Sequence, residues 1–363
     1  MISVCMIVKD EEAYLRTLLS LLVHQFDEVI VVDTGSTDNS KEIVQTTKGV
    51  RYFERLWDQD FAAARNAAIA HATSDYILVL DADETIPSDA RHILDQFIAV
   101  HPNDLGVTRV ISDQWTEVAN QQQAVSHITR FFPNHPSIRY EGIIHEQVVD
   151  HTGIRRRLDT GLLIHHAGYA LPVAAMKKKS LRNLALIDRA LSLEPSSPQL
   201  TYYQYQRGKS LDQLQRHAEA LQSYAEALKR GAVAYPFYPE LMMAYLYDLK
   251  RSGDQTTLWD VVGKALSQLP DYPDLYFFIG IALIQLQVPN LDMIQQAFET
   301  CLALGDKSDK YPTVIGTGSF LAAYNLGAFY ESQQDTARAR SYYEMAAMAG
   351  YTPAKARLAT LLH

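Results

Sequence analysis

The sequence predicts two parts of different fold class: an N-terminal α/β domain with a mainly parallel sheet, and a C-terminal all-α domain of tandem repeats. Short apolar runs alternate with helical patterns over residues 1–175, which is typical of βαβ units. From about Met176 the pattern becomes helical and stays so. Tyrosine marks the same change, because 16 of the 21 tyrosines follow residue 200. The expected domains are therefore residues 1–175 and 176–363.

The alternation in the N-terminal part can be followed element by element. After residue 33 comes a turn rich in cap residues, so Thr37 or Asp38 is expected to start a helix that runs to about Lys48. Parallel α/β sheets bind their ligands at the carboxyl ends of the strands, where Asp33 and Asp81 are expected. The expected strands are 2–8, 28–33, 50–53 and 76–80, and the other expected helices are 11–22 and 61–72.

Four similar segments fill most of the C-terminal part, at residues 202–231, 239–269, 275–305 and 320–350. Each has the pattern of two helices of about 12 residues joined by a short polar turn, with recurring small and aromatic residues. This pattern resembles the tetratricopeptide repeat, in which small residues lie where paired helices touch. Residues 306–317 are interpreted as an insertion and 352–362 as a capping helix. An irregular helical domain is the alternative.

Composition excludes several classes of protein. The 363 residues suffice for about two domains, and 47% hydrophobic with 21% charged residues excludes a disordered or fibrous chain. No apolar run reaches the roughly 18 residues of a spanning helix, and the N-terminus lacks the features of a signal peptide. The two cysteines, Cys5 and Cys301, exclude a disulfide scaffold and a multi-cysteine metal site. They fit a cytoplasmic location.

The net charge of −9 is shared unevenly, with 24 acidic and 17 basic residues in 1–180, against 18 and 16 in 181–363. Neither half is a basic domain, so no nucleic-acid partner is expected. Two short basic runs, at 155–157 and 177–179, are interpreted as a solvated turn and a helix start. An acidic half with local basic spots suits a metal-dependent site for an anionic substrate.

The Asp81-x-Asp83 pair is the sharpest chemical signal. Two carboxylates directly after a buried strand cannot both face the core, because an unpaired buried charge is very unfavourable. If both reach the crevice at the sheet edge, they can hold Mg²⁺ or Mn²⁺, which would bridge to the diphosphate of a nucleotide. A solvated loop is the alternative interpretation of such a pair.

Two further residues suit a nucleotide site. Asp33 can accept a hydrogen bond from a uracil N–H or a ribose hydroxyl; its alternative role is to cap the following helix. Arg65 can neutralise a diphosphate; its alternative role is a surface salt bridge on an alanine-rich helix. No phosphate-binding P-loop and no G-x-G-x-x-G sequence occurs, so nucleotide binding would depend on the metal and on side-chain cations.

Three motifs resemble family 2 glycosyltransferases over about residues 1–170: residues 3–12, 32–38 and 80–84. Residues 57–66 resemble the branch with a W-D-x-D-F-x-x-A-R-N signature. The resemblance implies a GT-A type fold and an inverting, metal-dependent transfer. It also implies that Asp83 is a metal ligand. Asp81, the other carboxylate of the pair, is a further candidate ligand. The family often has a second aspartate where Thr34 stands. The residues expected to contact the nucleotide are Val8, Lys9, Glu11, Asp33, Arg65, Asp81 and Ala82.

Three downstream segments fit the same branch: residues 129–132 (R-x-F), 140–146 (G-x-I-H-E) and 164–169 (H-x-G-Y). An inverting transfer needs a base that deprotonates the acceptor. Glu146 is the candidate base, and Asp113 and Glu117 are the reserve candidates. His145 is expected to orient Glu146 or the acceptor. His166 is a candidate metal ligand, since imidazole is acceptable to Mn²⁺.

The predicted function is an inverting transfer of a sugar from a UDP-sugar, with Mn²⁺ or Mg²⁺, to a Ser, Thr or Cys side chain of a peptide or protein. The branch includes peptide glycosyltransferases, and stacked repeats expose a groove suited to extended peptides. A glycan or lipid-linked glycan acceptor is one alternative, and a repeat-based binding protein with an inactive transferase domain is another. A homodimer is possible, and the sugar is left open.

Overall fold

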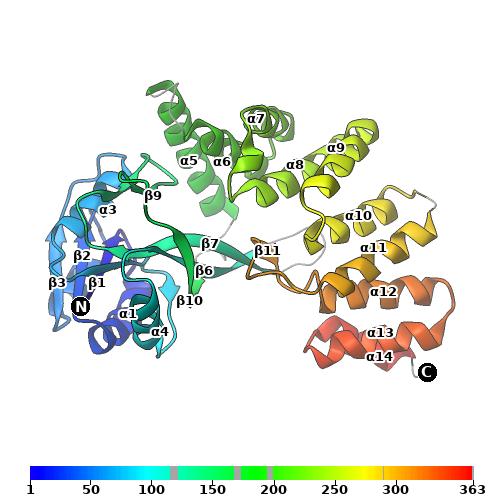
Figure 1. Ribbon diagram of the computed structural model, residues 1–363, viewed down its shortest axis with the longest axis horizontal. Helices are drawn as coiled ribbons and strands as arrows, with labels where there is room; N and C mark the ends of the chain where they lie inside the picture. The colour runs from blue at the N-terminus through cyan, green and yellow to red at the C-terminus, as the bar shows by residue number, and fades with distance from the viewer. Residues whose placement is uncertain (115–121, 167–172, 194–198, 289, 362–363) are drawn as a thin grey trace. The chain divides into compact units, whose positions relative to one another are not determined.

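The computed structural model describes residues 1–114, 122–166, 173–193, 199–288 and 290–361. Strands and helices alternate as far as residue 100, strands follow as far as residue 166, and helices dominate from residue 173 (Figure 1). The chain forms two compact units. The first contains residues 1–115 and 126–216, and the second contains residues 116–125 and 217–363. Each unit is described by itself.

The sheet of the first unit has the strand order β3-β2-β1-β4-β7-β6-β10-β5. Its strands β1, β2, β3 and β4 pair in parallel, whereas β4 pairs antiparallel with β7. The predicted α/β class is therefore confirmed, with antiparallel strands added on one side. The strands are β1 (Ile2–Val8), β2 (Glu28–Asp33), β3 (Val50–Glu54), β4 (Tyr76–Val79), β5 (Glu84–Thr85), β6 (Leu105–Gln114), β7 (Gln122–Pro133), β8 (Ile138–Glu141), β9 (Gln147–Asp150) and β10 (Arg157–His166).

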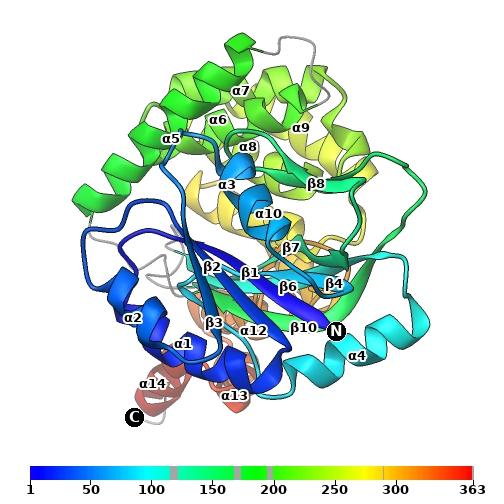
Figure 2. The ribbon, with the colours of Figure 1, turned by 90° about the vertical axis from the view of Figure 1, so that its left-hand side faces the viewer.

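Helices cover both faces of this sheet, because the parallel strands are apolar on both sides. Alternate residues of β1 show the division: Val4 and Met6 pack with helices α1, α2 and α4, whereas Cys5 packs with α3. Figure 2 shows α1, α2 and α4 on one side of strands β1–β3, with α3 on the other. The helices are α1 (Glu12–Gln25), α2 (Ser40–Thr46), α3 (Phe61–Ala70), α4 (Ala90–Val100), α5 (Val173–Leu193) and α6 (Leu200–Gln213).

The carboxyl ends of the central strands meet at one edge of the sheet. Val8 is in register with Asp33, and Cys5 is in register with Val79. Leu80 continues this pairing, since its N–H donates to the Cys5 carbonyl at 3.2 Å. The acidic motif that follows Leu80 therefore lies at the same edge as Asp33, as the strand pattern predicts.

Helices α5 and α6 belong to the first unit, although they continue into the helical part of the chain. Leu186 and Ile187 of α5 and Tyr203 of α6 form one apolar cluster with Ile144, which is 3% exposed. Compact packing therefore extends beyond the change from mixed to helical structure near residue 173.

The second unit consists of helix pairs, as the repeat pattern predicts. Its described residues contain α7 (His217–Lys229), η1 (Ala232–Ala234), α8 (Tyr238–Ser252), α9 (Gln255–Gln268), α10 (Pro273–Gln285), α11 (Leu291–Leu304), β11 (Thr313–Val314), α12 (Phe320–Ser332), α13 (Thr336–Met348) and α14 (Thr352–Leu361). With α6, these helices match the four predicted segments and the capping helix. The predicted insertion contains β11, which pairs with residues 124–125 of β7.

Buried groups fix this insertion to α10. The carboxylate of Asp274 accepts hydrogen bonds from the hydroxyls of Thr313 and Thr317, each at 2.5 Å. It also accepts one from the backbone N–H of Val314 at 2.8 Å. Both cysteines are free and buried. Among the described residues, no helix combines the length and the apolarity needed to cross a membrane.

Small residues allow close helix packing in the second unit, and one pair of glycines tests this. A Cβ at Gly280 in α10 would lie 2.6 Å from the Phe298 ring, whereas a Cβ at Gly263 in α9 would meet nothing within 4 Å. We expect Gly280→Ala to lower the free energy of unfolding by about 1–3 kcal/mol. Gly263→Ala should raise it by about 0.5–1 kcal/mol. Denaturant unfolding of both variants measures the difference, and equal effects would contradict the packing argument.

Candidate active site

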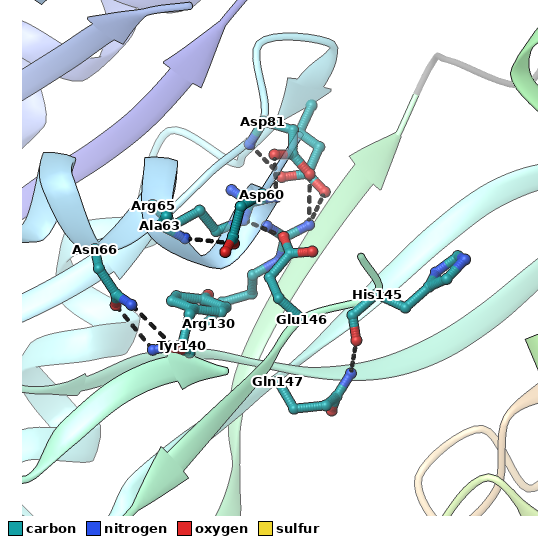
Figure 3. A network of polar contacts seen from close by, with 11 residues as sticks. Asp60, Ala63, Arg65, Asn66, Asp81, Arg130, Tyr140, His145, Glu146 and Gln147 are labelled. Atoms are coloured by element: carbon teal, nitrogen blue, oxygen red, sulfur yellow. Dashed lines mark hydrogen bonds and ion pairs between the residues drawn. The ribbon is translucent and has the colours of Figure 1, made fainter. Parts of the chain in front are cut away.

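Two buried arginines converge on Asp81 (Figure 3). Nη2 of Arg65 lies 2.8 Å from Asp81 Oδ1, and Nη2 of Arg130 lies 2.9 Å from Asp81 Oδ2. The arginine side chains are only 9% and 7% exposed. Both oxygens of the carboxylate are therefore paired inside the protein, which offsets the unfavourable burial of its charge.

These contacts extend into a chain of ion pairs. Arg65 Nε lies 2.5 Å from Glu146 Oε1, and Arg130 Nη2 lies 2.7 Å from Glu84 Oε1. We call Glu146, Arg65, Asp81, Arg130 and Glu84 the arginine–carboxylate network. It links the end of β4 to α3, β5, β7 and the loop before β9.

Burial by itself would raise the pKa of the Asp81 carboxyl, but Arg65 and Arg130 outweigh it and hold that pKa far below its ordinary value. Burial raises the pKa of Glu84 to about 7; Arg130 opposes this shift and the Asp81 charge adds to it. Asp81 is therefore the carboxylate that stays ionised at neutral pH, close to the sheet edge.

Helix α3 places Arg65 because of its local sequence. Asp60 caps the helix, since its side chain accepts from the Ala63 N–H at 2.8 Å. Ala64 and Ala68 are buried, and their small side chains let the helix approach the sheet closely. Asn66 fixes the same helix to β8 through two hydrogen bonds of 2.9 Å with the backbone of Tyr140. The alternative of a surface salt bridge for Arg65 is wrong, because this face of α3 is buried.

Asp83 and His166 come together at the end of the sheet. His166 Nε2 lies 3.1 Å from Asp83 Oδ2, and His166 is in register with Glu84 of β5. Burial lowers the pKa of His166 against the effect of Asp83, which favours a neutral imidazole. Burial also raises the pKa of Asp83, although His166 opposes the shift. A carboxylate beside a neutral imidazole is a donor set that fits Mn²⁺, so the residues present fit the expected metal.

Glu146 and His145 lie on a tight loop, residues 142–146. Gly142 has a φ of +102°, and a Cβ there would lie 2.7 Å from the Tyr203 hydroxyl, so a side chain at this position would be strained. His145 also has a positive φ, 51°. Its ring points away from Glu146 (Figure 3) and stacks edge-to-face on Tyr202 with ring centres 6.4 Å apart. The His145 ring therefore forms no contact with the Glu146 carboxylate in the described structure, and its role stays a prediction.

At the end of β2, Asp33 is 3% exposed. Its Oδ1 accepts from the backbone N–H groups of Gly35 and Ser36, each at 2.7 Å. Its Oδ2 is buried without a hydrogen-bond partner in the described structure. A buried acceptor without a partner is unfavourable, so this oxygen is available to a ligand. Helix α2 is capped elsewhere, since Asp38 Oδ1 accepts from the Ser40 N–H at 2.9 Å.

The other predicted nucleotide contacts lie along the same edge. Val8 is buried, and its carbonyl accepts from both the N–H and the hydroxyl of Thr34 at 3.0 Å, which gives Thr34 a structural role. Lys9 is exposed and Ala82 is buried. Burial, together with the charges of Asp83 and Asp81, raises the pKa of Glu11 to about 7. Glu11 therefore faces the acidic motif.

The sequence pattern of the family described as "Glycosyl transferase family 2" matches residues 3–168. Residues 3–168 are therefore similar to glycosyl transferase family 2. The matched range contains the whole arginine–carboxylate network as well as Asp83 and His166, so it includes every predicted site residue.

Three known proteins are similar to this chain over part of its length. A TPR repeat-containing protein of Synechococcus elongatus is 42% identical over 153 residues, which cover 41% of this chain and 36% of that protein. The SPbeta prophage-derived glycosyltransferase SunS of Bacillus subtilis is 25% identical over 288 residues, 77% of this chain and 66% of SunS. The chain thus spans less than two thirds of either relative. A crystal structure of S. aureus TarS 1-349 aligns at 14% identity with a TM-score of 0.36, covering 82% and 90% of the two chains.

Sequence reasoning missed two members of the arginine–carboxylate network. Arg130 lies in the R-x-F segment, but the segment alone says nothing of a contact with Asp81. Glu84 directly follows the acidic motif. Its burial is explained by the ion pair with Arg130 and by the hydrogen bond that it accepts from the Asp81 N–H at 2.9 Å. The reserve bases cannot be compared with Glu146, because Glu117 and the side chain of Asp113 lie outside the described residues.

Arg130 offers a stability test of the network. Arg130→Met leaves Asp81 and Glu84 without one cation, and breaking a buried ion pair in this way costs about 3–5 kcal/mol of unfolding free energy. The control is Arg139→Met, whose ion pair with Glu141 is exposed (55% and 33%) and should contribute at most about 1 kcal/mol. Urea unfolding compares the two variants; similar small losses would show that the network does not stabilise the domain.

Proposed function

We propose that the protein is an inverting, metal-dependent glycosyltransferase that uses a UDP-sugar as donor. The observation that supports this most directly is the pairing of Asp83 with His166 at 3.1 Å beside Asp81, at the carboxyl edge of the sheet in a family 2 domain. Ligands of parallel α/β sheets bind at this edge.

The nucleotide would lie over the ends of β1, β2 and β4. The unpartnered Oδ2 of Asp33 would accept from the base or the ribose. Arg65 Nη1 is also buried without a partner in the described structure, so it can donate to a ligand while Nη2 and Nε hold the carboxylates. Lys9 is exposed at the same edge and can approach the phosphates.

Asp83 and His166 would hold the divalent cation, Mn²⁺ or Mg²⁺, with Asp81 beside them. When bound, the ion offsets the negative charge that develops on the departing diphosphate. In addition to burial, the negative charges of Asp83 and Asp81 raise the pKa of Glu11, and that of Asp81 raises the pKa of Asp83, so a cation would be favoured beside them.

Glu146 would act as the base. Its Oε1 is held by Arg65, which fixes the carboxylate, and its Oε2 has no hydrogen-bond partner in the described structure. That oxygen would take the proton of the acceptor hydroxyl or thiol as this group attacks the anomeric carbon from the face opposite the diphosphate.

The acceptor we propose is a Ser, Thr or Cys side chain of a peptide or protein, because the second unit is a stack of tetratricopeptide-like helix pairs. Incubation with donor and candidate polypeptides should add one sugar mass to such a side chain. Transfer only to glycans would instead favour the glycan-acceptor alternative. The cytoplasmic location and the homodimer remain predictions.

The metal assignment is tested with Asp83→Asn. We expect release of UDP from UDP-sugar to fall by about two orders of magnitude or more with little change in melting temperature, because one charged ligand is lost while the shape is kept. The control is Asp89→Asn, an exposed aspartate that should leave the rate unchanged. Full turnover by Asp83→Asn at limiting, chelator-buffered Mn²⁺ would contradict the assignment.

The base assignment is tested with Glu146→Gln. Donor binding should persist, and kcat should fall by about 10²–10⁴-fold, the usual contribution of general base catalysis. Thermal shifts with UDP-sugar and Mn²⁺ report binding, since a donor at one hundred times Kd stabilises by about 2.7 kcal/mol. Near-normal transfer would move the role to Asp113 or Glu117.

A further inference from the structure

Helices α5 and α6 bring three basic side chains towards the loop of residues 142–146. Lys179 and Arg182 are three residues apart on α5 and therefore share one face of that helix. The Arg182 guanidinium stands over the Phe61 ring at 5.7 Å, and the Phe61 N–H donates to the Ile143 carbonyl of the loop at 2.9 Å. Arg182 is thus placed beside the loop that carries His145.

Lys209 reaches the same region from α6 through aromatic contacts. Its ammonium lies 5.3 Å from the centre of the Tyr205 ring. The Tyr205 ring lies 6.1 Å from that of Tyr202, and Tyr202 in turn contacts the ring of His145. The Ile144 side chain is buried against both helices, so the loop and the two helices form one packed body.

Two of these side chains, Arg182 and Lys209, are not paired with a carboxylate of the described residues. Burial, reinforced by the charges of Lys209, Lys179 and Arg182, lowers the pKa of His145 to about 3. The imidazole is therefore neutral, and three cations act on it.

His145 also has an unused polar atom. Its Nε2 is buried and has no hydrogen-bond partner among the described residues. A buried polar atom of this kind normally has a partner, and leaving it without one is unfavourable. Arg182 and Lys209 are close by and have no carboxylate partner within the described part of the chain. They favour an anion as the group that accepts a hydrogen bond from the Nε2–H of His145.

We propose that His145, Arg182 and Lys209 form a subsite for an anionic group of the acceptor, a carboxylate or a phosphate, beside the position where the sugar is transferred. The proposal rests on the proposed glycosyltransferase function and narrows its acceptor to an acidic or phosphorylated polypeptide. Arg182 would bind the anion through its planar guanidinium, and Lys209 would add a point charge.

The position of the cations distinguishes this subsite from one for the donor diphosphate. Lys179 is among the principal charges acting on Asp83 and His166, whereas Arg182 and Lys209 are not. All three act on His145, which adjoins the proposed base Glu146. Arg182 and Lys209 therefore act mainly on the loop that carries Glu146 rather than on Asp83 and His166.

Inorganic phosphate is the probe for the test, and the full-length chain is used. Histidine ring ¹⁵N resonances are recorded during a phosphate titration, and the His145 signal is assigned by its loss in His145→Gln. We expect phosphate to shift this signal in the native protein. The apparent affinity should fall by at least about tenfold in Arg182→Gln/Lys209→Gln, since hydrogen bonds to charged groups are the stronger ones.

Matched variants separate this site from general charge effects. Lys177→Gln/Lys178→Gln removes the same charge from exposed positions of α5 and should leave the phosphate affinity unchanged. Arg182→Lys/Lys209→Arg keeps the charge and should retain most of the binding. The single variants Arg182→Gln and Lys209→Gln provide the measurement if the double variant does not fold.

Three results would overturn the proposal: no shift of the His145 signal, an unchanged affinity in Arg182→Gln/Lys209→Gln, or displacement of phosphate by UDP with Mn²⁺. The last result would assign the cations to the leaving diphosphate. Phosphate that stays bound in the presence of UDP and Mn²⁺ supports an acceptor subsite. Because the signal needs no turnover, a failure of glycosyl transfer itself would be seen separately, as absence of UDP binding or release.

Discussion

The pairing of two buried arginines with the Asp81 carboxylate is the constraint on which the site depends. Buried charges are tolerated only with partners, and Arg65 and Arg130 occupy both oxygens of Asp81. Each arginine holds a second carboxylate, Glu146 or Glu84, so the position of one side chain determines the relative placement of α3, β5, β7 and the loop of residues 142–146. The alanines of α3 serve the same constraint, because they let Arg65 reach the core.

The order of apolar and polar residues was sufficient to predict those strands and helices whose pattern lies within one short segment. Strands 2–8 and 28–33 were predicted with the bounds of β1 and β2, and the four helix pairs follow from their spacing of small and aromatic residues. Asp83 and His166 could be connected only through the family resemblance. The contact of Arg130 with Asp81 could not be predicted, because it joins antiparallel β7 to β4 across 49 residues, and periodicity carries no information about such partners.

The packing of α5 and α6 is a second feature that the sequence pattern does not predict. The change to helical periodicity near Met176 suggests that a cut there would separate two independent parts. In the structure, such a cut would remove Leu186, Ile187 and Tyr203, which cover Ile144 in the loop that carries Glu146. Tyr203 also occupies the space beside Gly142. The first helices of the helical part therefore support the transferase site directly.

Charge is divided within the first unit in a way that suits transfer between two different ligands. Glu11 and Asp83 add negative charge near the end of β4, and in the proposed function a cation there would offset it when an anionic diphosphate binds. The charges that lower the pKa of His145 are those of Lys209, Lys179 and Arg182. Glu146 lies between these regions, tied by Arg65 to the acidic one and by its loop to the basic one. If Glu146 is the base, as proposed, an acceptor that approaches from the basic side would reach it without competing with the nucleotide. The separation of charge would then help to orient the two substrates.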